Sequence, residues 1–151
     1  METNGTLTAT ASSTTELPLT FTNTYSVDET TASFPVKKVV SVPAGLAGPA
    51  DWTYTMTLTA VTEGAPLPSD TELEATKAAP VVTFGAITYT APGEYTYNVT
   101  ESGTVAGGTN DTVNPKTVTV TVVETNGTLT ATASSTTELP LTFTNTYSAV
   151  S

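Results

Sequence analysis

The chain contains one long segment twice. Residues 2–26 and residues 124–148 both read ETNGTLTATASSTTELPLTFTNTYS. Identity over this length indicates a tandem array whose period is about one domain, larger than the roughly 20–50 residues of solenoid repeats. We expect residues 27–148 to form one complete domain, residues 1–26 to be the final strands of the preceding repeat, and residues 149–151 to be a short stub. Such arrays are typical of stalks, spacers and multivalent displays.

Composition excludes several classes of function. The net charge is −10, and the four cationic residues are all Lys, so the surface repels nucleic acid and anionic lipid. Because the chain has no His and no Cys, it lacks His-based acid–base catalysis, Cys nucleophiles and the common zinc ligands. We expect no cofactor, no metal and no membrane insertion. Abundant Thr, high acidity and few charges are common in secreted bacterial surface proteins, which favours an extracellular location.

The pattern of Thr and apolar residues predicts strands. Thr makes up about a quarter of the chain and favours β structure. Alternation such as that over residues 117–122 puts Val on one face and Thr on the other. The main predicted strands cover residues 32–42, 52–61, 81–90, 94–101, 116–124, 128–133 and 140–147. Their short turns, including the Asn126-Gly127 hairpin signal, predict an all-β, immunoglobulin-like β-sandwich.

Two further segments carry expectations. Ser69-Asp70-Thr71-Glu72 fits a helix capping box, which predicts one short helix over residues 69–77. In the leading copy, residues 6–11 and 17–25 are predicted to be strands, and residues 27–31 a linker.

Three predicted strands each place a polar residue on the face that points inward: Lys38, Glu101 and Asn145. The apolar neighbours on the same three faces are Phe34, Val36 and Val40, then Tyr95, Tyr97 and Val99, and finally Leu141, Phe143 and Tyr147. An unpaired charge in a core costs several kcal/mol. These three side chains therefore need one another, or another compensating partner.

One reaction accounts for all three residues. Burial drives Lys38 toward its neutral, nucleophilic amine and Glu101 toward its protonated form. Attack of Lys38 Nζ on the side-chain carbonyl of Asn145 would expel ammonia and leave an amide cross-link, with Glu101 carrying the protons. This is a single-turnover self-modification, so we do not expect an enzyme that acts on a substrate.

The segments around these residues resemble a known family. VKKVV at Lys38, APGEYTYNVTES at Glu101 and LTFTNTY at Asn145 are similar to the pilin isopeptide-linkage domain of Gram-positive surface pili, of the streptococcal major-pilin (T-antigen) type. The resemblance implies an immunoglobulin-like sandwich, a spontaneous bond between Lys38 and Asn145 catalysed by Glu101, and a structural role beside adjacent copies of the same repeat. It also implies a location at the bacterial cell surface, attached to the cell wall through the parent protein. The chain departs from the family where Asn110-Asp111 and then Asn114-Pro115 stand in place of a frequent Tyr-Asp pair.

Alternatives stay open for each residue. Lys38 could reach solvent from an edge strand, Glu101 could be a solvated carboxylate at a strand end, and Asn145 could be a buried amide bonded to backbone. Asn23 is the counterpart of Asn145 in the leading copy. That copy could be a loose tail, a strand laid along a sheet edge, or a strand donated in trans, in which Asn23 reacts with Lys38 of a neighbouring molecule.

The leading interpretation is a structural domain of a pilus or adhesin stalk. The alternative is a ligand-binding adhesin module that grips host glycan or matrix protein with an exposed loop, residues 63–80 or residues 102–115, because binding residues concentrate on loops held by a rigid scaffold.

Overall fold

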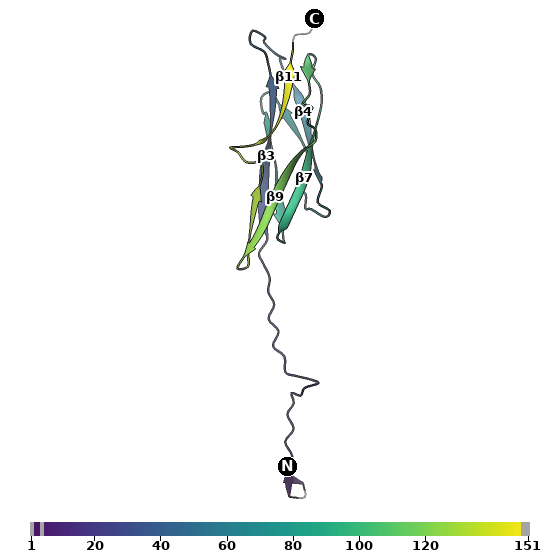
Figure 1. Cartoon of the computed structure of the whole chain (residues 1–151), viewed down its shortest axis with the longest axis vertical. Helices are drawn as coiled ribbons and strands as arrows, with labels where there is room; N and C mark the ends of the chain where they lie inside the picture. The colour runs from purple at the N-terminus through teal and green to yellow at the C-terminus, as the bar shows by residue number, and fades with distance from the viewer. Residues whose placement is uncertain (1, 4, 149–151) are drawn as a thin grey trace.

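The structure is a computed structural model that describes residues 2–3 and 5–148. Two sheets face each other in the domain, and the described residues contain no helix, which confirms the all-β prediction (Figure 1). The five-stranded sheet has the order β10-β9-β7-β4-β5 and the four-stranded sheet the order β6-β3-β11-β8. Their bounds are β3 (Thr30–Ser41), β4 (Thr53–Ala60), β5 (Glu72–Thr76), β6 (Val81–Tyr89), β7 (Gly93–Ser102), β8 (Gly108–Thr109), β9 (Lys116–Thr125), β10 (Thr128–Ala133) and β11 (Leu141–Tyr147).

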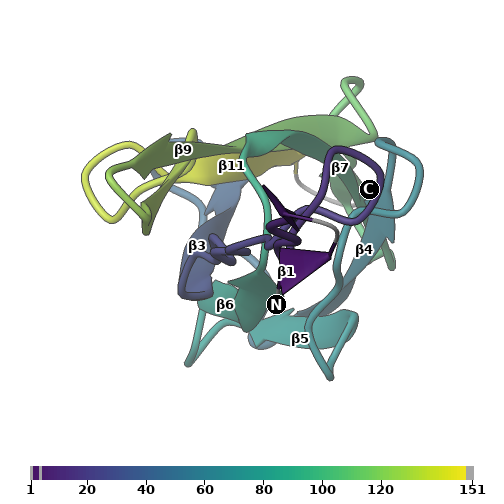
Figure 2. The same cartoon turned by 90° about the horizontal axis from the view of Figure 1, so that it is seen from below.

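The core follows the alternation in the sequence. Seen end-on, the strands of the two sheets surround it (Figure 2). In β9, Val118, Val120 and Val122 are buried, while the residues between them are only partly buried or exposed. The largest apolar and aromatic side chains that are fully buried in the core are Phe34, Tyr54, Phe84, Tyr89, Tyr97 and Phe143. The long predicted strands match the observed ones within two residues at each end.

The β9–β10 hairpin forms where the sequence predicts it. Asn126 has φ 52° and Gly127 has φ 85°, the positive values that a tight hairpin turn of this kind requires. Oε1 of Glu124 accepts a hydrogen bond from the Gly127 N–H at 2.8 Å, which ties the turn to the end of β9.

The predicted helix over residues 69–77 is wrong. The segment instead contains β5, an edge strand that pairs antiparallel with β4. Ala75 is buried and Leu73 packs against the core, so alternate residues face inward. A helix this short is marginal by itself, whereas pairing with β4 satisfies the backbone and buries the apolar side chains.

The strands predicted in the leading copy are mostly absent. Of the residues described in this copy, only β2 (Thr6–Leu7) and β1 (Glu2–Thr3) pair, and residues 8–27 run on without strand pairing (Figure 1). The identical sequence forms β10 and β11 in the domain because β9 and β3 are there to pair with it. The stub over residues 149–151 lies outside the described residues.

Strands β3 and β11 are the first and last long strands of the domain, and they pair in parallel. Phe143 lies opposite Lys38, and Asn145 lies opposite Val40. Partners in a pair point to the same side of a sheet, and alternate residues share a face. The register therefore points Lys38 and Asn145 into the sandwich from neighbouring strands.

Candidate cross-linking site

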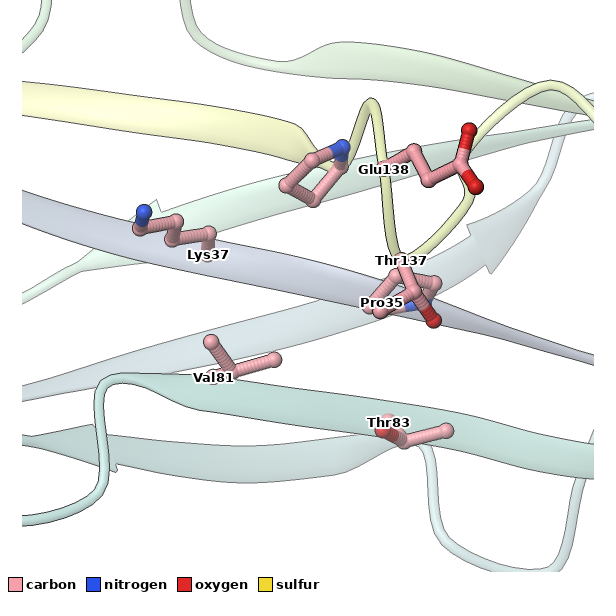
Figure 3. Close-up of a pocket in the computed structure, with 7 residues that line it drawn as sticks. Pro35, Lys37, Val81, Thr83, Thr137 and Glu138 are labelled. Atoms are coloured by element: carbon pink, nitrogen blue, oxygen red, sulfur yellow. The ribbon is translucent and has the colours of Figure 1, made fainter.

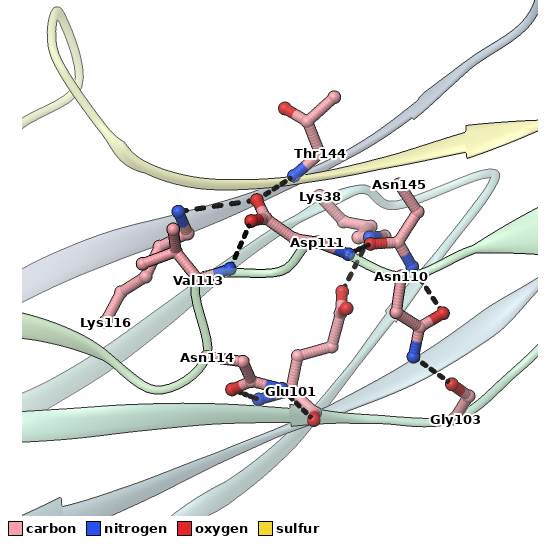
Figure 4. A network of polar contacts seen from close by, with 10 residues as sticks. All are labelled: Lys38, Glu101, Gly103, Asn110, Asp111, Val113, Asn114, Lys116, Thr144 and Asn145. Carbon is pink, nitrogen blue, oxygen red and sulfur yellow. Dashed lines mark hydrogen bonds and ion pairs between the residues drawn. The ribbon is translucent and has the colours of Figure 1, made fainter.

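Lys38, Glu101 and Asn145 meet inside the sandwich (Figure 4). Lys38 comes from β3 and Asn145 from the adjacent β11, whereas Glu101 reaches across from β7 in the opposite sheet. Their exposed fractions are 1%, 0% and 4% in the order Lys38, Asn145, Glu101. All three side chains are therefore shielded from water.

An ion pair joins Lys38 to Glu101. Nζ of Lys38 lies 2.6 Å from Oε2 of Glu101, and both side chains are fully buried. Among the described residues, neither Lys38 Nζ nor the two Glu101 carboxylate oxygens have a well-aligned hydrogen bond. Burial lowers the pKa of the Lys38 amine, while the contact with Glu101 opposes that shift. A short proton transfer to Glu101 would release the neutral amine that nucleophilic attack requires.

The ring of Tyr54 forms another wall of the site. Lys38 Nζ lies 4.4 Å from the centroid of this ring, so the cation interacts with the aromatic face. Within the part of the chain that the structure describes, the buried Tyr54 hydroxyl has no hydrogen-bond partner.

The carboxamide of Asn145 is held at both ends. Oδ1 accepts a hydrogen bond from the main-chain N–H of Asp111 at 2.8 Å. Nδ2 donates to Oδ1 of Asn110 at 3.1 Å. Asn110 in turn donates from Nδ2 to the carbonyl of Gly103 at 2.8 Å. These contacts fix which end of the Asn145 amide is oxygen and which is nitrogen.

The Asp111 carboxylate ties the loop over residues 103–115 to β11. It accepts hydrogen bonds from the N–H of Thr144 and the N–H of Val113, both at 2.9 Å, and it lies 3.3 Å from Lys116 Nζ. The hydrogen bond from the Thr144 N–H lowers the pKa of Asp111 most, and the hydrogen bond from the Val113 N–H lowers it further. The carboxylate therefore stays ionised and keeps its main-chain N–H beside Asn145.

Asn114 holds the main chain of Glu101. Its Oδ1 accepts from the Glu101 N–H at 3.0 Å, and its Nδ2 donates to the Glu101 carbonyl at 2.8 Å. The β7–β9 ladder ends at the pair Val99 and Lys116. The side chain of Asn114 therefore takes over the role of a paired strand just beyond the end of the ladder.

A family model for the Spy0128-like isopeptide-containing domain matches residues 34–148 of this chain. The chain belongs to this family. The resemblance inferred from the sequence is thereby confirmed.

Comparisons with individual proteins show less similarity than the family model does. No curated protein matches the chain significantly. Among solved structures, the chain is similar to the major pilin protein (T-13) of Streptococcus pyogenes, with 19% identity and a TM-score of 0.49. That alignment covers 82% of this chain and 55% of the pilin, so the isopeptide-containing domain spans about half the length of its relative.

The structure also places the remaining residues discussed above. Lys37 is exposed on the outer side of β3, and Asn23 is exposed in the leading segment, away from the buried cluster. The alternation that predicts Lys38, Glu101 and Asn145 does not extend to Asn110, Asp111 and Asn114. In the sequence, these three residues are marked only by a loop rich in Asn and Asp before the β9 hairpin and by the departure from the family at the same positions.

Outside the buried cluster, the surface of the domain carries loops and a pocket. The loop over residues 102–115, one of the two loops considered for ligand binding, is tied to the buried site. A pocket of about 300 Å³ lies instead on the outer face of the four-stranded sheet (Figure 3). It is lined by Pro35, Lys37, Val81, Thr83, Thr137, Glu138 and Pro140. Within the described ranges, no helix is long and apolar enough to cross a membrane.

Proposed function

We propose that this chain is a structural domain of a bacterial surface pilus or adhesin stalk, locked by an amide bond between Lys38 Nζ and Asn145 Cγ. The observation that carries the proposal is the 2.6 Å contact between Lys38 and Glu101, buried beside a fixed Asn145 carboxamide. Membership of an isopeptide-containing family supports the same chemistry. The partners are adjacent copies of the repeat, and the location is the cell surface.

The three side chains supply every bond that forms or breaks. Glu101 takes one proton from Lys38, and the neutral amine attacks Cγ of Asn145. The new C–N bond forms, Glu101 passes a proton from the attacking nitrogen to Asn145 Nδ2, and the bond from Cγ to Nδ2 breaks. Ammonia leaves, and the atoms balance without a cofactor.

The folded core would accelerate the reaction by holding the two reacting groups together. Holding two groups in reactive geometry is equivalent to an effective concentration of about 10⁵–10⁸ M in favourable cases. Because the product amide stays in the core, each chain reacts once. The domain is therefore its own substrate and does not turn over.

The cross-link suits a stalk because of where it lies. It joins two parallel, adjacent strands that begin and end the domain. Closing a loop of about 100 residues removes chain entropy from the unfolded state, worth roughly 4–5 kcal/mol of stability by the same argument used for disulfides.

Intact mass under denaturing conditions tests the bond. We expect the wild-type chain to be lighter than its sequence mass by one ammonia, about 17 Da. Lys38→Ala, Asn145→Ala and Glu101→Gln should each have the full sequence mass, the last because Gln cannot carry the proton. Lys37→Ala, one residue away and exposed, is the matched control and should keep the loss. A wild-type chain at full mass would overturn the proposal.

A specific observation favours a second function for the leading copy. Leu17, Leu19 and Phe21 are 77%, 75% and 88% exposed, whereas Phe143, the counterpart of Phe21, is fully buried. We propose that this segment can replace β11 of a second molecule, where Asn23 would react with Lys38. The chain's own β11 competes at high effective concentration, so exchange would be a minor route.

A denaturing gel distinguishes the two routes. Strand exchange predicts a ladder of covalent oligomers that grows in Asn145→Ala, where the intramolecular bond is lost, and disappears when Asn23→Ala is added. A single monomer band in Asn145→Ala would rule out covalent exchange.

A further inference from the structure

We propose that the loop over residues 103–115 supplies the other half of the reaction centre. In this arrangement the main-chain N–H of Asp111 is the oxyanion donor, and Oδ1 of Asn110 holds the amino group that leaves. The inference rests on the proposed cross-linking reaction and adds two groups to it.

The Asp111 N–H lies where negative charge develops. Attack on Cγ moves an electron pair onto Oδ1 of Asn145, and this oxygen already accepts the Asp111 N–H at 2.8 Å. A donor that is fixed in place before the reaction stabilises such charge most effectively in a site without water, and Asn145 is 0% exposed.

The Asp111 side chain keeps this donor in position. Its carboxylate is bonded to Thr144, the residue directly before Asn145, and to Val113 within the loop. Lys116 lies beside the same carboxylate and offsets its charge, which would otherwise repel a nearby oxyanion. The carboxylate is thus a positioning group, and the N–H is the group that touches the reacting atoms.

Asn110 faces the leaving group. Nδ2 of Asn145 must gain a proton and depart as ammonia, and it already donates to Asn110 Oδ1 at 3.1 Å. Because Asn110 Nδ2 donates to the Gly103 carbonyl, the oxygen of Asn110 is the end that faces Asn145. An acceptor there strengthens its hydrogen bond as the leaving nitrogen gains positive charge.

The Asp111 N–H, the Asn110 oxygen and Glu101 each have a separate role in the reaction. Glu101 carries protons from the Lys38 side, Asp111 N–H stabilises the oxygen, and Asn110 guides the nitrogen. The carboxamide thus meets a partner at every atom that changes charge.

The rate of ammonia loss tests both assignments. The full chain is made in a short pulse of cell-free translation, and samples are quenched in denaturant and weighed. Fluorescence of Trp52, the only Trp, reports folding separately. Asn110→Ala should slow ammonia loss about tenfold at an unchanged folding rate, the effect of losing one hydrogen bond of about 1.4 kcal/mol. Asn98→Ala, on the outer side of β7, is the matched control.

Asn110→Asp separates leaving-group contact from loop support. It keeps an acceptor toward Asn145 but cannot donate to Gly103, so its rate should stay within about threefold of wild type. If Asn110→Ala reacts as fast as wild type, or if Asn110→Asp is as slow as Asn110→Ala, the role of Asn110 is wrong.

The Asp111 N–H is removed by translating the α-hydroxy acid analogue of Asp at this position, which changes one amide to an ester. We expect ammonia loss to slow about 10²-fold or more, while the same exchange at Thr112 has little effect. An unchanged rate at position 111 would overturn the oxyanion assignment. A wild-type chain that never loses ammonia would instead overturn the proposed function itself.

Discussion

At the scale of single residues, the polar side chains of the buried cluster are held in an unfavourable state. Lys38 carries a charge in a core where its partners are Glu101 and the ring of Tyr54, and among the described residues the Glu101 carboxylate oxygens and the Tyr54 hydroxyl beside it lack well-aligned hydrogen bonds. Removing a charge from such surroundings is favourable because the desolvation cost disappears. Conversion of the Lys38 amine into a neutral amide would relieve that cost, so burial and reaction favour each other.

The lowered pKa of Lys38 predicts a pH dependence that only the unreacted domain shows. In Asn145→Ala the amine remains, and its pKa in the folded state lies below the ordinary value of 10.5. The unfolded state then binds more protons than the folded state between these two pKa values, so stability rises with pH across that window.

We therefore expect the free energy of unfolding of Asn145→Ala to increase as pH rises from neutral toward 10.5, relative to Lys38→Met/Asn145→Ala. Urea titrations at several pH values measure the difference, and the double variant cancels the titration of the tyrosines. A difference that stays constant or shrinks with pH would contradict the lowered pKa.

At the scale of strands and loops, the strands with a periodic residue pattern could be predicted from the sequence, and the site residues in the irregular loop could not. The long strands follow from alternation, and Lys38, Glu101 and Asn145 are visible as polar exceptions within it. Asn110, Asp111 and Asn114 lie in a loop without periodicity, so nothing in the pattern distinguishes them from ordinary turn residues. The helix over residues 69–77 and the strands of residues 17–25 were wrong because a pairing partner, present for β5 and absent for the leading copy, decides the outcome.

The two hydrogen bonds from the Asn114 side chain to the main chain of Glu101 predict that Asn114→Ala is less stable. Asn114→Ala removes both hydrogen bonds to the main chain of Glu101 and leaves partly buried groups unpaired, at a cost of about 1–3 kcal/mol. The free energy of unfolding should be measured in an Asn145→Ala background, where no cross-link complicates the transition. Asn98→Ala is the control. Equal free energies of unfolding of the two variants would show that the Asn114 hydrogen bonds do not contribute to stability.

At the scale of the whole molecule, the leading segment and the end of the domain that carries β11 lie toward opposite ends of the long axis (Figure 1). A pull on the termini therefore enters the domain through β3 and leaves through β11, which are neighbouring parallel strands. Without a covalent bond, the hydrogen bonds between these strands carry the load in shear. With the bond, the load passes from Lys38 to Asn145 through covalent links.

Single-molecule stretching shows this difference directly. Asn145→Ala should extend when it unfolds by the length of the chain between the two cross-linked positions, about 110 residues at roughly 3.3–3.6 Å each. The wild-type domain should lack this extension event, because the bond keeps that segment out of the load path. An equal extension in both chains would contradict the claim that the cross-link carries the load.

Peptide mapping tests the central claim most directly, because it locates the bond. Trypsin cuts after Lys but not after a Lys whose amine is in an amide. We predict that the denatured wild-type chain yields residues 38–77 joined to residues 117–151, at the sum of the two peptide masses less one ammonia, about 17 Da. Recovery of residues 117–151 as a free peptide at its full mass would contradict the account.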